Sequence, residues 1–404
     1  ACRWPSVMTE ARRISILGAT GSVGQATLDL VSRAEAGSYQ VVALTARTNA
    51  LQLADLAITH GAECVALADT DQASVLREAL SAHPHIEIGI GDTAIVEAAS
   101  READWVMAAI VGAAGLRPTL AALRQGRNLA FANKECLVCS GSLFMEEANR
   151  YGTRLLPVDS EHNAIFQVFD QDQRDSIKAI TLTASGGPFR EWSLRQMQTV
   201  TRKDALAHPT WEMGAKITID SATMMNKGLE IIEACWLFGL DQSMVDVVVH
   251  PQSIIHGLVE YSDGSVLAQL GSPDMRTPIA SALAWPERMA APVERLSLSQ
   301  LSRLDFEAPD TRRFPSLRLA RDVIAAGGCA PAVLNAANEI AVASFLNGTV
   351  GFLDIARCVE ESLKRSVSDA DMPSGLSAFD DVFAIDRRAR AIARDVIAAL
   401  AVKV

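Results

Sequence analysis

The sequence lacks the marks of a nucleic-acid-binding or membrane-spanning protein. Among its 404 residues no run of Lys and Arg stands out, and the formal net charge is −11. An acidic chain without a basic patch is poorly suited to nucleic acid or to an anionic membrane surface. Its longest apolar run, Trp105 to Leu116, contains glycines and is too short to cross a bilayer. No stretch resembles a secretory signal, so we expect a cytoplasmic protein that binds neither nucleic acid nor membranes.

The cysteines lack the pattern of a disulfide framework. Seven are scattered along the chain, and an odd, widely spaced set suits free thiols in a reducing compartment. Cys136 and Cys139 form a C-x-x-C pair, but no second pair or nearby His completes a zinc site. We interpret the pair as incidental, with a redox role as the alternative.

A glycine-rich turn near the start of the chain indicates a dinucleotide site. Arg13 to Leu17 predicts a short buried strand, Gly18 to Gly24 follows with the spacing G-x-x-G-x-x-G, and Gln25 to Ser32 predicts a helix. Glycines let the backbone approach a pyrophosphate, and the N-terminus of the following helix offers free N–H groups. This order of elements is typical of a Rossmann-like domain.

The second predicted strand, Gln40 to Thr45, lacks the acid that NAD-binding proteins place after it. Such an acid holds the ribose 2′-hydroxyl group. Here the strand is followed by Ala46, Arg47, Thr48 and Asn49. An arginine in place of an acid favours a 2′-phosphate, so we predict that the cofactor is NADPH.

Further alternation of strands and helices predicts a doubly wound parallel sheet, in which ligands lie beyond the carboxyl ends of the strands. Two polar segments occupy such ends. One is the segment 133–135, and the other is Asp159 and Glu161, which follow an apolar run at 155–158. We therefore expect the cofactor and these acids to face one crevice.

Asp159 and Glu161 predict a metal site. If the chain stays extended there, both carboxylates point to one side and need a cation between them, together with a third oxygen ligand. A helix predicted from an N-cap at Ser221 to about Phe238 offers Glu230, with Glu233 one turn later, and spacing alone does not choose between the two. Asn, Lys and hydroxyl groups near the start of this helix make a reasonable phosphate pocket.

The chain divides into four predicted regions. Residues 1–158 form the Rossmann-like domain, 159–290 a central α+β domain, 291–315 a linker, and 316–404 a bundle of helices. Within the central domain the segment 185–214 has few core-like apolar positions, and we expect a mobile lid there. One otherwise apolar helix of the bundle carries three polar residues without evident chemistry, namely Asn335, Asn338 and Glu339.

Several motifs together resemble the 1-deoxy-D-xylulose 5-phosphate reductoisomerase family, over Ile14 to about Ile397. The most specific are LPVDSEHNAIFQ (156–167), SGGPFR (185–190), SATMMNKGLE (221–230), HPQSIIH (250–256) and GSPDMRTP (271–278). The resemblance implies rearrangement and NADPH-dependent reduction of 1-deoxy-D-xylulose 5-phosphate to 2-C-methyl-D-erythritol 4-phosphate, a step of non-mevalonate isoprenoid synthesis. It also implies a homodimer in the cytoplasm of a bacterium.

The resemblance assigns roles to individual residues. It implies that Mg²⁺ or Mn²⁺, with Co²⁺ as a further option, binds to Asp159, Glu161 and Glu230, and it prefers Glu230 to Glu233. The phosphorylated sugar would be held by Ser160, Glu161, Ser185, His208, Ser221, Asn226, Lys227 and Glu230. The catalytic residues would be Lys134, Asp159, Glu161, His208 and Glu230. NADPH would contact Thr20, Gly21, Ser22, Val23, Arg47, Thr48, Asn49, Asn133, Glu135 and Gly214.

Two rival functions remain at this stage. The glycine turn would also suit an aspartate-semialdehyde dehydrogenase, which needs a Cys nucleophile with a His base. Cys136 and Cys139 lie near the cofactor side, although no segment resembles the catalytic Cys motif of that family. A non-catalytic NADPH-binding regulator is the other alternative, and the three acids argue against it.

Overall fold

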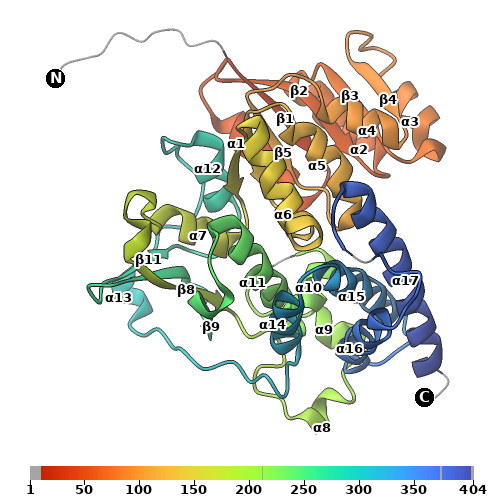
Figure 1. The fold of residues 1–404 in the computed structure, drawn as a ribbon. Coiled ribbons are helices and arrows are strands. Elements are labelled where there is room, and N and C mark those ends of the chain that lie inside the picture. The colour runs from red at the N-terminus through yellow and green to blue at the C-terminus, as the bar shows by residue number, and fades with distance from the viewer. Residues whose placement is uncertain (1–10, 212, 374, 402–404) are drawn as a thin grey trace.

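The structure is a computed structural model that describes residues 11–211, 213–373 and 375–401. It consists of a seven-stranded sheet with helices on both faces, a separate four-stranded sheet, and a group of C-terminal helices (Figure 1). This arrangement confirms the predicted α/β class. None of the helices within the described ranges is long and apolar enough to cross a membrane.

The first sheet is parallel throughout, as predicted. Its strand order is β4-β3-β2-β1-β5-β6-β7, so the chain reverses direction across the sheet between β1 and β5. Ligands of such sheets bind at this switch point, beyond the carboxyl ends of the strands. The strands are β1 (Arg12–Leu17), β2 (Tyr39–Ala46), β3 (Cys64–Leu67), β4 (Glu87–Ile90), β5 (Trp105–Ala108), β6 (Asn128–Phe131) and β7 (Arg154–Pro157).

Helices cover both faces of this sheet because its strands are apolar on both sides. One face packs against α1 (Ser22–Arg33), α2 (Ala50–His60), α3 (Ala73–Ala79) and α12 (Arg276–Ala284). The other face packs against α4 (Asp92–Ala99), α5 (Leu116–Leu123) and α6 (Lys134–Tyr151). In its packing α12 therefore belongs with the first sheet, although the sequence analysis placed these residues in the central domain 159–290.

Two glycines of the first turn are required by close contacts. Gly18 has φ of +91°, and a Cβ atom there would lie 2.8 Å from the carbonyl oxygen of Ala109. A Cβ atom on Gly24 would lie 2.4 Å from the carbonyl oxygen of Gly18. These glycines pack the turn against α1 and against the segment after β5, while Gly21 is the N-cap of α1 and has no side chain to block its free N–H groups.

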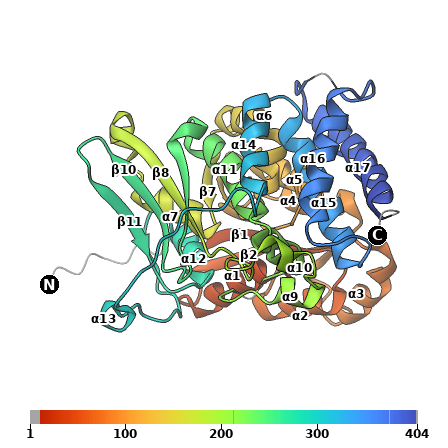
Figure 2. The ribbon, with the colours of Figure 1, turned by 90° about the horizontal axis from the view of Figure 1, so that it is seen from below.

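The second sheet has the order β11-β10-β8-β9 and forms part of the central region. Its strands are β8 (Ile177–Ala184), β9 (Val245–Val249), β10 (Ile255–Tyr261) and β11 (Val266–Leu270), of which only β8 and β9 pair in parallel. Three helices stand between the two sheets and the C-terminal region, namely α7 (Ser160–Val168), α10 (Ala215–Ala222) and α11 (Met225–Phe238). Figure 2 shows the second sheet to one side of α11 and α10.

The C-terminal helices share a core with the second sheet rather than forming a separate body. After a largely irregular stretch with one short helix, α13 (Leu298–Leu301), the chain forms α14 (Ser316–Ala326), α15 (Ala330–Leu346), α16 (Asp354–Val367) and α17 (Phe379–Ala401). One apolar cluster runs from Ile180 and Leu182 of β8 through α11 to Leu334 of α15. The irregular stretch is tied to the sheet by a bridge between Val249 and Glu307.

The expectation that the segment 185–214 has few core residues is wrong for residues 185–206. Phe189, Met197, Val200 and Ala205 are buried in the same apolar cluster, and the segment contains the short helices α8 (Leu194–Met197) and α9 (Arg202–Leu206). The guanidinium of Arg313 donates to the carbonyl oxygens of residues 190 and 192 at 2.7 and 2.8 Å. Only residues 207–214 remain free of these attachments, and Glu212 lies outside the described residues.

We predict that Phe189→Ala destabilises the protein by about 3–5 kcal/mol, as expected for removal of a buried aromatic ring. Phe189 is 1% exposed, and its ring centroid lies 4.9 Å from those of Trp192 and Phe352. Urea unfolding followed by near-UV circular dichroism measures the effect. Leu194→Ala is the matched control, because Leu194 is 47% exposed in the same segment. Equal stability of the two variants would show that the segment is not part of the core.

Candidate active site

Asp159 and Glu161 come together at the start of a helix, not along an extended strand. Asp159 is the N-cap of α7, and its Oδ1 accepts from the backbone N–H groups of Glu161 and His162 at 3.2 and 3.3 Å. The predicted period-2 geometry is therefore wrong, although both side chains do line one cavity. A carboxylate at this position is also favoured by the helix dipole.

Two lysines bind the predicted acids. Lys134, at the start of α6, places Nζ 2.6 Å from Asp159 Oδ2, 2.9 Å from Asn226 Oδ1 and 3.3 Å from Glu230 Oε1. Lys227 donates to Glu161 Oε1 at 2.9 Å and to Glu230 Oε2. Glu230 is fully buried and accepts from both lysines and from Asn226. The acids from two regions of the chain thus form one cluster.

The charges of this cluster are strongly coupled. Burial, with added repulsion from Asp159 and Glu161, raises the pKa of Glu230 to about 7. Burial would also raise the pKa of Asp159, but the positive charges of Lys134, His162 and Lys227 hold it well below its usual value. Counted with Glu233, which faces His162, four carboxylates here meet three positive charges. When all of these groups are ionised, the surplus of negative charge favours a further cation.

A divalent cation has a choice of ligands here. Atoms of Asp159, His162 and Glu230 lie within 4.8 Å of one another. His162, however, is engaged on both ring nitrogens: Nε2 lies 3.0 Å from the carbonyl oxygen of Glu230, and Nδ1 lies 3.0 Å from Glu233 Oε2. Glu161 instead lines the cavity and offers an oxygen, the ligand type that Mg²⁺ and Mn²⁺ prefer. Glu233, the alternative left open by spacing, faces His162 instead.

The helix that carries Glu230 begins later than predicted. Ser221 lies in the last turn of α10 and is not an N-cap, because the chain breaks at Met224, where φ is +60°. A non-glycine residue in this conformation is strained, and such strain is typical of functional sites. The break lets Ser221, at the end of one helix, and Asn226 and Lys227, at the start of the next, face the same cavity.

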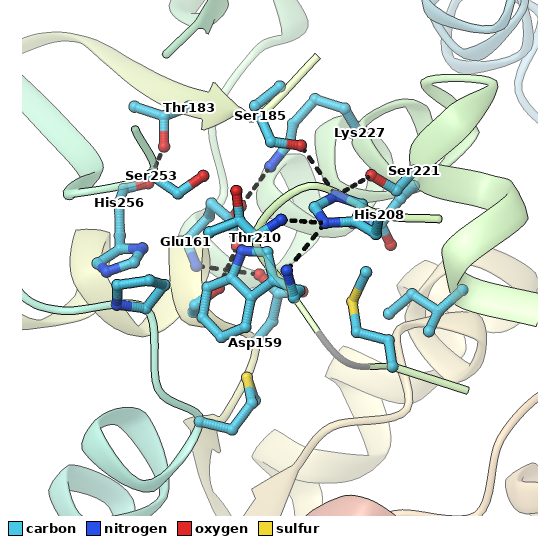
Figure 3. A pocket seen from close by; sticks show the side chains of 18 of the residues that line it. Asp159, Glu161, Thr183, Ser185, His208, Thr210, Ser221, Lys227, Ser253 and His256 are labelled. Atoms are coloured by element: carbon cyan, nitrogen blue, oxygen red, sulfur yellow. Dashed lines mark hydrogen bonds and ion pairs between the residues drawn. The ribbon is translucent and has the colours of Figure 1, made fainter. Parts of the chain in front are cut away.

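His208 connects two serines across the cavity (Figure 3). Its Nε2 lies 3.1 Å from Ser185 Oγ and 3.0 Å from Ser221 Oγ. Its Nδ1 accepts from the backbone N–H groups of Thr210 and Trp211 at 3.1 and 2.9 Å. Burial lowers the pKa of His208. Since Nδ1 is an acceptor, the proton of the neutral ring is on Nε2, which points into the cavity.

One cavity of about 520 Å³ collects most of the predicted site residues. Its lining combines residues that follow β1, β6 and β7 of the first sheet with Thr183 and Ala184 of β8 in the second sheet. The predicted residues that line it are Ser22, Val23, Lys134, Asp159, Ser160, Glu161, Ser185, His208, Gly214, Ser221, Asn226 and Lys227. Glu230 lies directly behind this lining, bonded to three of its members.

The remaining predicted cofactor residues lie outside the cavity. Thr20, Gly21, Arg47, Thr48 and Asn49 follow the carboxyl ends of β1 and β2, and all but Thr20 are exposed.

Asn133 and Glu135 are buried at the N-terminus of α6 and are engaged with the protein itself. Asn133 donates to the carbonyl oxygens of Ile110 and Gly112, and Glu135 accepts from Lys216 at 2.9 Å.

The sequence reasoning missed several residues of the cavity wall. Thr183, Ser253, His256 and Asp274 line it, and the ring centroid of His256 lies 6.2 Å from that of Trp211. Ser253 and His256 belong to the motif HPQSIIH, which had been noted without a role. Its density of polar residues at the start of a strand was the signal that could have placed them here.

The cysteines do not support the dehydrogenase alternative. Cys136 and Cys139 are buried, neither lines the cavity, and burial raises the pKa of both thiols. A thiol with a raised pKa is a poor nucleophile.

Fold and site together define a protein of the dinucleotide-binding type, with an acidic, lysine-lined cavity beside its glycine turn. Family models match three stretches: "1-deoxy-D-xylulose 5-phosphate reductoisomerase" at residues 14–141, its "C-terminal domain" at 155–238, and "DXP reductoisomerase C-terminal domain" at 270–392. The chain belongs to the 1-deoxy-D-xylulose 5-phosphate reductoisomerase family, which confirms the resemblance.

Relatives and solved structures agree over nearly the whole chain. The 1-deoxy-D-xylulose 5-phosphate reductoisomerase of Rhodospirillum centenum is 57% identical over 389 residues, covering 96% of this chain and 95% of the relative. The structure of the Zymomonas mobilis reductoisomerase in complex with NADPH has a TM-score of 0.89 at 53% identity, covering 96% of this chain and 99% of that one. A reductoisomerase solved with NADPH, fosmidomycin and magnesium has a TM-score of 0.90 at 43% identity, with the same coverage.

We predict that Asp159→Asn and Glu230→Gln each weaken Mn²⁺ binding by about tenfold or more, because each removes a charge that a divalent ion needs. Titration calorimetry measures the affinity. Glu260→Gln is the control, since Glu260 is an exposed acid on β10.

Two further variants decide the third ligand. We expect Glu161→Gln to weaken Mn²⁺ binding more than His162→Asn does. The opposite order would assign the ion to the buried histidine instead.

Proposed function

We propose that this chain converts 1-deoxy-D-xylulose 5-phosphate to 2-C-methyl-D-erythritol 4-phosphate with NADPH and a divalent metal ion, Mg²⁺ or Mn²⁺. Its membership of the reductoisomerase family supports this, and relatives have been solved with NADPH and magnesium. The observation that carries the proposal is the cluster of Asp159, Glu161 and Glu230, joined by two lysines, at the wall of a cavity beside the glycine turn. A non-catalytic NADPH sensor would have no need of such a cluster.

In this proposal the regions divide the work. Residues up to 158 bind NADPH, 159–290 supply the catalytic residues and the dimer contact, and 316–401 support both through the linker 291–315. NADPH lies along the carboxyl edge of the first sheet, where it contacts Thr20, Gly21, Ser22, Val23, Arg47, Thr48, Asn49, Asn133, Glu135 and Gly214. The 2′-phosphate end lies toward Arg47, which is exposed and has no acid beside it in the sequence.

The metal ion is held by Asp159, Glu161 and Glu230. When bound, the ion supplies polarisation of the substrate's carbonyl and hydroxyl oxygens, and NADPH supplies the hydride. The protein's part is to offset the negative charge of these carboxylates: Lys134, which lines the cavity, donates to Asp159 at 2.6 Å, and Lys227 donates to Glu161 at 2.9 Å. Ser160 donates to Glu161 at 2.5 Å and so orients that ligand.

The phosphate of the substrate is anchored by Ser185, Ser221, Asn226 and Lys227. The neutral His208 carries its proton on Nε2, close to the hydroxyl groups of both serines. From there it donates a hydrogen bond to a phosphate oxygen bound beside the serines. The binding energy of the phosphate then positions the other end of the sugar for reaction. Binding energy from a non-reacting group contributes to catalysis in this way.

The lid is limited to residues 207–214 in this proposal. Trp211 already lies beside His256 on the cavity wall, and the segment is tied down mainly through His208. Closure of this short segment over the substrate excludes water from the reaction.

A homodimer in the bacterial cytoplasm is the proposed state of the protein. The edge strand β11 exposes Val266, Leu267 and Leu270, and an apolar edge of this kind is normally covered by another chain. The mass in solution, measured by light scattering, should be twice that of the chain.

The proposal is tested by following NADPH absorbance with 1-deoxy-D-xylulose 5-phosphate. We expect loss of absorbance with Mg²⁺ or Mn²⁺ and none after removal of metal with a chelator. Asp159→Asn, Glu161→Gln and Glu230→Gln should each lose most of the activity while remaining folded. Metal-independent turnover, or binding of NADPH without any turnover, would contradict the proposal.

We also predict a preference for NADPH over NADH that depends on Arg47. A charge-assisted hydrogen bond contributes roughly 1.5–3 kcal/mol, so Arg47→Ala should narrow the ratio of kcat/KM values about ten- to a hundredfold. Arg77→Ala, a change on α3, is the control. An unchanged ratio in the Arg47 variant would move this role to Thr48 or Asn49.

A further inference from the structure

The helix α15 carries three polar side chains that the reaction does not use. Asn335, Asn338 and Glu339 have the spacing i, i+3, i+4 and so share one face. Asn335 and Asn338 are fully buried. Burying polar groups destabilises a fold unless they are hydrogen-bonded, so their partners are informative.

Glu339 reaches out of the C-terminal region to the loop after β5. Its Oε1 lies 3.3 Å from the backbone N of Ala113, which donates to it, and accepts from Asn335 at 3.1 Å. Its Oε2 is paired with Arg390 of α17 at 2.5 Å, and Arg390 is held in turn by Asp386 at 2.7 Å. The carboxylate is therefore fixed on one side and binds the loop with the other.

The loop needs a glycine beside Glu339, because its backbone has a positive φ there and a side chain would also approach the carboxylate closely. Gly112 has φ of +78°, and a Cβ atom on it would lie 2.9 Å from Glu339 Oε1. Any other residue at this position would push the loop and the carboxylate apart.

This loop, residues 109–113, lies between two groups assigned to the cofactor. On one side the carbonyl of Ala109 packs against Gly18 of the glycine turn. On the other side the carbonyl of Gly112 accepts from Asn133 at 3.0 Å. Between them Val111 exposes 66% of its surface, which offers an apolar contact at the carboxyl edge of the sheet.

The same face of α15 also holds α10. Asn338 donates to Asp220 at 2.8 Å, Asp220 pairs with Lys216 at 2.7 Å, and Lys216 pairs with Glu135 at 2.9 Å. Figure 2 shows α15 beside α10, in agreement with these bonds. The polar face of α15 thus contacts structure on both sides of the predicted cofactor residues.

We propose that Glu339, fixed by Arg390, is a positioning residue for the nicotinamide half of NADPH, acting through the loop 109–113. The strand β5 lies on the opposite side of β1 from β2, so this loop faces the half of the dinucleotide that is remote from Arg47. The inference rests on the proposed binding of NADPH. It assigns to the C-terminal helices a direct effect on cofactor affinity.

The test compares two ligands that share only the adenine end. NADPH affinity is measured by its fluorescence, and adenosine 2′,5′-bisphosphate affinity by calorimetry. We expect Glu339→Ala to weaken NADPH by about tenfold, as for loss of one charge-assisted hydrogen bond, and to leave the bisphosphate unchanged. The KM for NADPH should rise while kcat changes little.

Rescue and control variants separate positioning from general damage. Glu339→Gln keeps an oxygen that can accept from Ala113, and should restore most of the affinity. Glu361→Ala removes an acid from the exposed face of α16 and should change neither affinity. If Glu339→Ala does not fold, Gly112→Ala disturbs the same contact from the side of the loop and should give the same selective loss.

The outcomes are distinct. Unchanged NADPH affinity in Glu339→Ala and Gly112→Ala, or equal weakening of both ligands, overturns the inference while the proposed function stands. If the wild-type chain shows no binding of either NADPH or the bisphosphate, the proposed function is overturned, and the inference with it.

Discussion

The structure depends on balancing the negative charges of three carboxylates around one cavity. Asp159, Glu161 and Glu230 come from two helices, and each alone would be unstable there without a positive partner. Lys134 and Lys227 supply those partners from the ends of two helices. The first sheet, α7 and α11 must therefore meet at one point, because the acids and the lysines that neutralise them come from different segments of the chain.

That requirement explains several local irregularities. The chain turns into α7 at Asp159, whose side chain caps the helix while its other oxygen binds Lys134. The break at Met224 turns the start of α11 toward the cavity, at the cost of an unfavourable backbone conformation. Without the break, Ser221 and Lys227 would lie on one continuous helix and diverge around it.

The C-terminal helices belong to the same physical unit as the site. Their apolar side chains continue the core of the second sheet, and the polar face of α15 contacts α10 and the loop after β5. Close-packed cores and buried hydrogen bonds transmit displacements, so substitutions far from the cavity can alter its geometry. Within the described part of the chain, the C-terminal helices contribute no residue to the cavity, yet they contact the segments that support it.

The sequence by itself determined the parallel sheet and the glycine turn, because these depend on local periodicity and residue chemistry. Its spacing left Glu230 and Glu233 as alternatives, and the preference for Glu230 came from the family resemblance. It did not determine that Asp159 caps a helix, that Ser221 ends one, or that Phe189 is buried. Short polar segments are compatible with more than one backbone conformation, and contacts between distant segments choose among them. The roles of Glu339 and His256 became visible only in the tertiary structure, since their partners lie far away in the sequence.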